Sequence, residues 1–237
     1  MLIKRLLVLV FVFALGGYAY AQYTGDGSKS AIVGTNHDLR SEFSGATAVC
    51  EFCHAPHKLS NPTITAPLLW NVQVKTGSYG TYSSSTLDAT DVRNPASASS
   101  ANSAAFMSLL CLSCHDGTVT EAAFYNREGL GGSGSFSPPN IGEQSTAGLT
   151  NDHPVDFTYS AALATADGGL ATPTEGTGVR VPYVGSGANS LPLFKDASTD
   201  ASGRLECATC HNPHNNANDP FLRRSNGASA LCTSCHT

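Results

Sequence analysis

The hydrophobic and polar positions of this chain predict few regular elements. Apolar residues at helical spacing predict one short helix at Ala104–Leu110. Two apolar segments, Val179–Val184 and Leu191–Phe194, flank a turn that contains Gly and Asn, and they predict a β-hairpin. Residues 94–105 and 126–151 are rich in Gly, Ser and Asn and show little periodicity. We therefore expect a fold that is mostly coil, with short helices and a few short strands.

The longest apolar run lies at the start of the chain. Residues 1–21 have the pattern of a secretory signal peptide, because Lys4 and Arg5 precede the run and Ala19–Ala21 follows it as a small-x-small cleavage site. The run is shorter than the ~20 apolar residues that span a bilayer, so we expect cleavage and no membrane insertion. The exported chain would comprise residues 22–237, outside the cell or at its surface, with the periplasm as the alternative.

The charge of the exported chain limits its partners. Removal of Lys4 and Arg5 changes the formal net charge from −5 to −7. Because phosphate recognition depends on clustered Lys and Arg, we expect no nucleic-acid partner. A basic redox protein or a mineral surface is compatible with this charge.

All eight cysteines lie in one motif, Cys-x-x-Cys-His, which occurs four times. We number the motifs in chain order: Cys50–His54, Cys111–His115, Cys207–His211 and Cys232–His236. This motif attaches c-type haem, since its two thiols form thioether bonds to the porphyrin and its histidine binds the iron. We expect four haem c groups, held by Cys50, Cys53, Cys111, Cys114, Cys207, Cys210, Cys232 and Cys235.

Two other interpretations of the cysteines are weaker. Disulfides are common in secreted chains, but four pairs at i, i+3 spacing, each followed by His, are not a disulfide pattern. Pairs of this spacing also build tetrahedral zinc sites. Zinc ribbons do not require a histidine after every second cysteine, so the sequence favours haem.

The histidine count predicts how the irons are ligated. The proximal ligands are the four motif histidines, His54, His115, His211 and His236. The remaining four equal the number of irons that need a distal ligand, and they are His37, His57, His153 and His214. We therefore expect bis-histidine ligation and low reduction potentials. Met107, the only methionine left after export, allows at most one Met/His haem, and its position suits helix packing better.

The first and third motifs carry an added Pro-His. His57 therefore follows His54 by three residues, and His214 follows His211 in the same way. Three residues span roughly 4.5 Å along a helix, so the two rings cannot approach one haem from opposite faces. Each added histidine must reach a neighbouring iron. We assign His57 to the second haem and His214 to the fourth haem.

Five further residues carry less certain roles. An isolated histidine such as His153 is usually a surface residue, but one iron lacks a ligand without it. His37 lies in a short polar segment near the mature N-terminus and would ligate a haem of its own chain or of a neighbouring molecule. We expect Trp70 to pack against a haem or the core. Arg223 and Arg224 either pair with haem propionates or lie exposed.

The motifs alternate between long and short forms, which indicates an internal duplication. We expect one tetrahaem domain with two tandem haem pairs, at about residues 22–150 and 151–237. Burying a few hundred Å² of each porphyrin is worth on the order of 10 kcal/mol per haem, as an upper bound. Because the polypeptide has few elements of its own, we expect the haem-free chain to be unfolded.

The chain resembles secreted multihaem cytochromes of the doubled Cys-x-x-Cys-His type. Beside the haem motifs, the resemblance rests on the Pro-His extensions, Pro67–Asn71, Cys111–Gly117 and Asp152–Val155, and it spans most of residues 37–237. Within this group the chain is most similar to tetrahaem cytochromes that polymerise into extracellular filaments. The resemblance implies a coil fold wrapped around a continuous chain of four haems. It also implies a homopolymer in which His37 ligates a haem of the adjacent subunit.

The leading functional hypothesis is electron transfer without catalysis, as a filament subunit that passes electrons to other redox proteins or extracellular acceptors. A monomeric secreted or periplasmic carrier is the alternative. A multihaem reductase needs a vacant iron position, and the histidine count leaves none. A structural or adhesive secreted protein stabilised by metal is the third class, and it would lack haem absorption bands.

Overall fold

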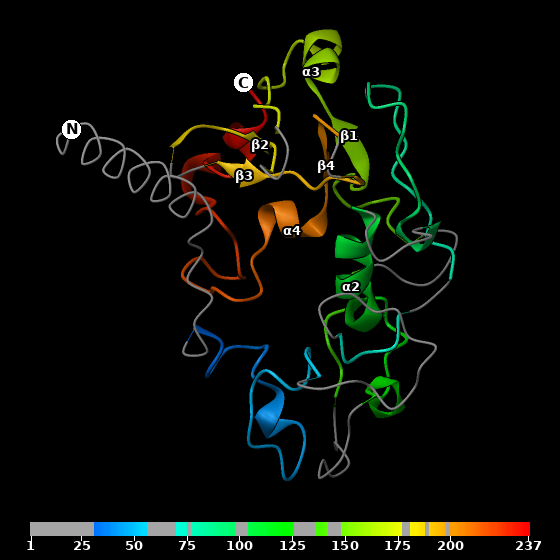
Figure 1. The fold of residues 1–237 in the computed structure, drawn as a ribbon, viewed down its shortest axis with the longest axis vertical. Coiled ribbons are helices and arrows are strands. Elements are labelled where there is room, and N and C mark those ends of the chain that lie inside the picture. Colours follow the sequence, from blue (N-terminus) through cyan, green and yellow to red (C-terminus); the bar gives the residue numbers. More distant parts are fainter. Residues whose placement is uncertain are drawn as a thin grey trace, which may run out of the picture.

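The computed structural model describes residues 31–55, 70–74, 77–97, 104–125, 136–141, 148–176, 181–187, 190–197 and 200–237. These residues form a chain that is mostly coil, as expected, with short helices and strands (Figure 1). The predicted signal peptide and His57 lie outside the described residues.

The regular elements are few and short. The α-helices are α2 (Ala105–His115), α3 (Ala161–Asp167) and α4 (Cys207–Cys210). The strands are β1 (Phe157–Tyr159), β2 (Tyr183–Val184), β3 (Leu191–Pro192) and β4 (Gly203–Leu205). Single 3₁₀ turns occupy Leu39–Ser41, Pro95–Ser97, Glu121–Ala123, Gly227–Ser229 and Cys232–Ser234.

Two of these elements confirm the sequence pattern. The predicted helix is present as α2, but it continues through the second motif to His115. The predicted hairpin is present as β2 and β3, which pair antiparallel with Tyr183 opposite Pro192 and Val184 opposite Leu191.

The sequence pattern did not predict β1, β4 or α3. The strands β1 and β4 pair antiparallel, with Phe157 opposite Leu205 and Tyr159 opposite Gly203. The helix α3 follows β1 directly, and its N-cap Ser160 accepts a hydrogen bond at Oγ from the Leu163 N–H. It ends at Gly168, whose φ of 73° is the left-handed conformation of a helix C-cap.

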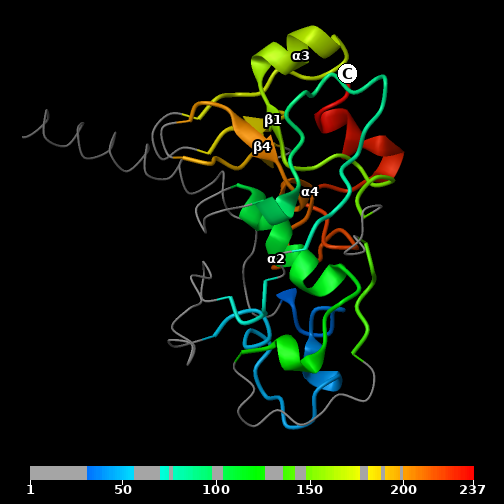
Figure 2. The same ribbon diagram turned by 90° about the vertical axis from the view of Figure 1, so that its right-hand side faces the viewer.

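The elements are distributed along a long axis, although the chain passes along it more than once. Residues 31–55 lie at one end, and α3 and the C-terminus lie at the other, in both views (Figures 1 and 2). The helices α2 and α4 lie between these ends and contact each other. The second and third motifs, which these helices carry, therefore meet near the middle of the molecule.

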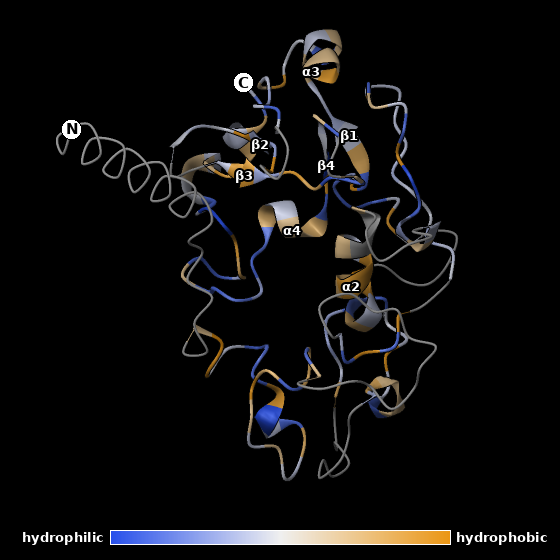
Figure 3. Ribbon diagram, in the orientation of Figure 1, coloured by the Kyte–Doolittle hydropathy of each residue, from blue (hydrophilic) through white to orange (hydrophobic). Residues whose placement is uncertain are grey.

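The hydrophobic core of the described residues is divided into three clusters. The first joins β1, β2, β3 and β4, and its buried members are Phe157, Tyr159, Val184, Leu191, Leu193, Leu205 and Cys235. The second consists of Phe43, Phe52, Val72, Ala123 and Phe124, and the third of Tyr79, Leu109, Leu112 and Leu149. Figure 3 shows the same division, with hydrophobic residues spread along the ribbon and not gathered in one layer.

Candidate functional site

Each motif adopts one helical turn. The second lies within α2. In the other three, the N–H of the histidine donates to the carbonyl of the first cysteine, at 2.8 Å in the first motif, 3.0 Å in the third and 2.9 Å in the fourth. This i to i−4 bond places two cysteines one turn apart and the histidine directly after them. The shared turn is the local geometry that attachment of both thiols to one porphyrin needs.

All eight cysteines are free thiols in the structure. Burial raises the pKa of Cys53 and Cys210 to about 11, and that of Cys114 and Cys235 to about 12. The described residues contain no group of three or more His, Cys, Asp or Glu side chains that could hold a metal ion directly.

The imidazoles form three pairs between motif histidines and the other histidines. The ring centroids of His37 and His115 are 6.2 Å apart, and those of His54 and His214 are 6.0 Å apart. The rings of His153 and His236 are separated by 6.4 Å. The planes within each pair meet at 49°, 24° and 75°, respectively, so the separation is common to the pairs while the tilt is not.

This separation fits one iron between two imidazoles. A bond of about 2.0 Å from metal to nitrogen on each side, with roughly 1.1 Å from nitrogen to ring centre, places the two centroids about 6 Å apart. Direct ring stacking would bring them closer, as it does for His37 and Phe221 at 4.3 Å. The spacing of the three pairs is therefore compatible with one iron between the two rings of each pair.

Proline carbonyls orient several of these rings. Nδ1 of His115 lies 2.8 Å from the Pro139 carbonyl oxygen, and Nδ1 of His211 lies 3.0 Å from that of Pro220. Nδ1 of His153 lies 3.0 Å from its neighbouring Pro154 carbonyl. A carbonyl only accepts, so Nδ1 carries the proton and Nε2 keeps a free lone pair for a metal. This is the usual support of a metal-ligating histidine.

The three described distal candidates are neutral near pH 7. Burial, followed by the charge of His115, lowers the pKa of His37 to about 4. Burial also lowers the pKa of His153 and of His214, with smaller contributions from His236 and His54. Since a protonated imidazole cannot bind iron, these environments favour the ligating form.

A cavity of about 260 Å³ lies beside the fourth motif. Both rings of the pair His153 and His236 line it, together with Cys235. Its other walls include Tyr82, Leu87, Pro154, Phe157, Tyr159, Leu163, Leu170 and Leu205. Thr86, Asp88 and Asp167 add polar groups to this lining, so a mixed cavity lies beside both imidazoles and a motif thiol.

The thiols of successive motifs are neighbours. The Cys53 thiol of the first motif lies close enough to Cys114 of the second to affect its pKa. The thiol of Cys111 in the second lies close enough to Cys207 of the third to raise its own pKa. Cys210 of the third lies near Cys235 of the fourth. The attachment points therefore follow one another in sequence order.

The pairing corrects one assignment made from the sequence. We expected His214 at the fourth haem, but its ring faces His54 of the first motif, and His153 faces the fourth motif instead. The expected partner of the second haem was His57, whereas His37 faces His115. Sequence spacing alone cannot assign these partners, because the contacts join segments that are far apart in the chain.

Trp70, Arg223 and Arg224, for which the sequence predicted further roles, each make a defined hydrogen bond. Trp70 donates from Nε1 to Ser113 Oγ at 3.1 Å and lies edge-on to His54, as expected for packing near a haem. Arg223 donates from Nε to the Ala208 carbonyl at 2.7 Å. Arg224 donates to Ser234 Oγ at 2.8 Å. The contacts of Arg223 and Arg224 do not test whether these arginines pair with haem propionates.

Sequence reasoning missed Phe221 and the buried charges Asp156, Arg204 and Glu206. Phe221 stacks on His37 with an angle of 16° between the ring planes. Arg204 and Glu206 alternate with Gly203 and Leu205 in the sequence. This alternation is a strand pattern, and it could have predicted β4.

Comparison with known proteins supports the haem interpretation. Residues 201–237, which hold the third and fourth motifs, match the family model of the doubled CXXCH motif. The match supports a multihaem c-type cytochrome. It indicates covalently bound c-type haem and an electron-transfer role. No curated protein gives a significant match to the chain.

Among the described residues, no helix is both long enough and apolar enough to cross a bilayer.

Proposed function

We propose that this protein relays electrons through four bis-histidine haem c groups and assembles into an extracellular filament. The observation that carries the relay is the separation of 6.0 to 6.4 Å within three imidazole pairs, each containing one motif histidine. His211 is left for His57, the remaining predicted distal ligand, or for an imidazole of a neighbouring copy.

Haem c, when bound, supplies a ferric–ferrous couple that accepts and passes on one electron. The chain's own residues hold and orient this group. Thiols attach it, imidazoles occupy both axial positions, and proline carbonyls fix the imidazole tautomers. The sequential order of neighbouring thiols supports a single line of haems from the first motif to the fourth.

The filament is the finer part of the proposal and rests on the resemblance of the sequence. It requires His37 to ligate a haem of the adjacent subunit. In the single chain this ring faces His115 and stacks on Phe221. We propose that polymerisation exchanges this contact between copies, as in domain swapping, so that the segment around His37 binds the next molecule. A head-to-tail exchange of this kind gives an open polymer.

Mass spectrometry and electron paramagnetic resonance of the exported protein test the relay. We expect the mass to include four haems and the ferric spectrum to contain low-spin species alone. A mass without the haem increments would contradict the cofactor assignment. A stoichiometric high-spin signal would instead favour a reductase with an open iron position.

Electron microscopy tests the filament separately. We expect helical polymers from the native protein and monomers from His37→Ala. Native monomers with four low-spin haems would reject the polymer and leave the electron relay intact.

A further inference from the structure

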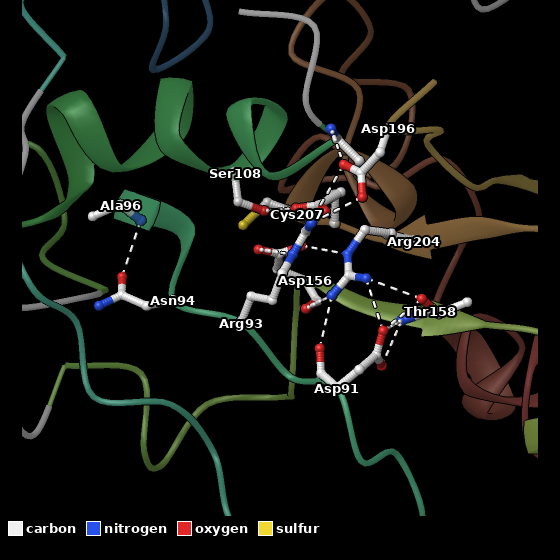
Figure 4. Close-up of polar contacts among 12 residues, drawn as sticks. Asp91, Arg93, Asn94, Ala96, Ser108, Asp156, Thr158, Asp196, Arg204 and Cys207 are labelled. Atoms are coloured by element: carbon white, nitrogen blue, oxygen red, sulfur yellow. Dashed lines mark hydrogen bonds and ion pairs between the residues drawn. The ribbon is translucent and has the colours of Figure 1, made fainter. Parts of the chain in front are cut away.

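A network of charged side chains, partly buried, lies beside Ser108 and Cys207 (Figure 4). At its centre is Asp156, whose side chain is fully buried. Arg204 donates from Nε to Asp156 Oδ1 at 2.6 Å, and Arg93 donates from Nη2 to the same oxygen at 2.8 Å. Arg204 also reaches Asp91 at 2.8 Å, and Arg93 reaches Asp196 at 2.8 Å.

The charges of this network do not balance. Two arginines face three aspartates, Asp91, Asp156 and Asp196, before any further group is counted. Asp91 is 45% exposed and so connects the network to solvent. A further buried negative charge here would have neither a counter-ion nor water.

Glu206 is that further group. It is fully buried, and Ser108 donates from Oγ to its Oε2 at 2.5 Å. Its Oε1 has no hydrogen-bond partner among the described residues, and the buried Asp156 carboxylate lies near enough to disfavour a second negative charge on Glu206. Two buried carboxyl groups in such an environment favour a state in which one of them carries a proton. The arrangement therefore favours one proton on the pair formed by Glu206 and Asp156.

The pair also contacts both attachment sites. Ser108 lies on α2 one turn before Cys111, and its Oγ accepts the N–H of Cys207 at 3.0 Å. Glu206 itself precedes Cys207. An electron that reduces the second or third haem would thus be added close to the buried carboxyl groups of Glu206 and Asp156.

We propose that Glu206 and Asp156 form a proton-binding site coupled to electron transfer between the second and third haems. This inference rests on the proposed function. An external reductant loses one electron, and one ferric iron of these haems becomes ferrous. The carboxyl pair takes one proton from solvent, and an O–H bond forms on Glu206. Reoxidation returns the electron to the next acceptor and the proton to solvent.

The physical reason is electrostatic. An added electron in a low-dielectric interior favours the protonated carboxyl over the carboxylate. By reciprocity, the bound proton favours the reduced haem. Burial and the facing Asp156 carboxylate raise the pKa of Glu206 to about 10 without haem. A positive ferric centre nearby would lower that pKa, which brings the titration toward neutral pH in the oxidised protein.

Several titratable or charged groups face the pair from the elements around it. They are Arg93 and Asp91 from the segment before the 3₁₀ turn Pro95–Ser97, Arg204 from β4, Asp196 from the segment after β3, Cys111 from α2 and Cys207 from α4. In the haem-bound protein both cysteines are uncharged thioethers, so the carboxyl pair is the titrating group.

Spectroelectrochemical titration of the holoprotein tests the inference. We expect the potential of one haem to fall as pH rises from neutral toward about 10, the pKa of Glu206. The limit is a tenfold change in equilibrium constant per pH unit, or 59 mV for one electron. Glu206→Gln should abolish this slope, because an amide cannot exchange the proton. Haem propionates contribute equally to both proteins, and the exposed matched control Glu175→Gln should keep the slope.

Ser108→Ala provides a second test if Glu206→Gln does not fold. The Ser108 hydroxyl stabilises the carboxylate, so its loss should move the pH-dependent step to higher pH. A merely structural role for Ser108 would leave that step in place.

A wild-type potential that does not change with pH, or an equal slope in Glu206→Gln, would overturn the inference. So would an unmoved step in Ser108→Ala. Each result can occur with four low-spin haems present, so none of them would reject the electron relay itself.

Discussion

At the residue scale, the backbone prepares individual histidines for iron. The carbonyls of Pro139, Pro154 and Pro220 each accept from an Nδ1–H, and this leaves Nε2 available. A proline in such a segment also has a restricted φ, which limits how far the accepting group can move. In the folded chain these contacts fix both the tautomer and the direction of the ring.

The imidazole pairs predict which haem each distal histidine serves. His214→Ala should open the first haem and convert roughly a quarter of the iron to high spin, because one of four irons loses an axial ligand. Electron paramagnetic resonance measures the conversion, and added imidazole should reverse it. The matched variant His153→Ala should open the fourth haem instead, which shifts a different set of paramagnetic haem-methyl signals in nuclear magnetic resonance. If the same haem-methyl signals shift in both variants, the pairing of His214 with the first haem and of His153 with the fourth is contradicted.

The buried ion pair of Arg204 and Asp156 predicts a stability effect. Arg204→Ala leaves Asp156 buried without its closest cation, and this should lower the free energy of unfolding of the holoprotein by about 3–5 kcal/mol. Denaturant titration checks the value. The comparison is Arg40→Ala, which removes a surface pair with Asp38 and should cause little change. Equal effects of the two substitutions would show that the buried network does not stabilise the fold.

At the element scale, short pieces of structure are held by contacts between distant segments. Strand β4 pairs with β1 on one edge, and its Arg204 also exchanges two backbone hydrogen bonds with Phe194, at 2.7 and 2.9 Å. Strands this short are marginal alone. Packing against the β2–β3 hairpin therefore decides whether β4 forms.

Gly203 marks the tightest point of this packing. A Cβ at this position would lie 2.6 Å from both Leu193 Cβ and Pro182 Cγ. Gly203→Ala should therefore destabilise the holoprotein by about 1–3 kcal/mol through overpacking. Thermal and denaturant unfolding measure the loss. Gly227→Ala is the control, because its Cβ would meet Ser225 Oγ only at 3.4 Å. A neutral Gly203→Ala would mean that the hairpin is not packed against β4.

The sequence predicted those elements whose pattern is local. The apolar spacing before Cys111 gave α2, and two apolar segments around a Gly-rich turn gave the hairpin. Strands β1 and β4 are too short for alternation to be recognised, and their pairing depends on a distant segment. The candidate site shows the same contrast between local sequence signals and contacts that depend on the fold. Motif spacing predicts the cysteines and proximal histidines, and counting predicts the distal set, but only the fold brings His54 to His214.

At the scale of the whole molecule, the polypeptide does not build one continuous interior. The three apolar clusters of the described residues are small; buried Cys235 belongs to the first, and half-buried Cys114 packs against the second. Most of the chain between them is coil. In the proposed holoprotein, the porphyrins provide the apolar surface that joins these clusters.

This arrangement predicts that the haem-free chain lacks a cooperative fold. Protein produced without haem attachment should show no cooperative thermal transition by circular dichroism, since the chain loses up to about 10 kcal/mol of burial per haem. Hydrogen exchange should show little protection outside α2. The holoprotein, measured at the same concentration, is the control. A sharp transition in the haem-free chain would show that its own clusters suffice for folding.

The closeness of Cys111 and Cys207 has a consequence for biogenesis. These thiols belong to different motifs, yet they lie within hydrogen-bonding reach of each other. In an oxidising compartment, a chain that reaches this arrangement before maturation would close a bridge between them and block two attachment sites at once. Ligation of the vinyl groups must therefore outpace oxidation. If oxidation comes first, the product is a haem-free chain with a disulfide between Cys111 and Cys207. A reductant should convert this chain back into a substrate for haem attachment.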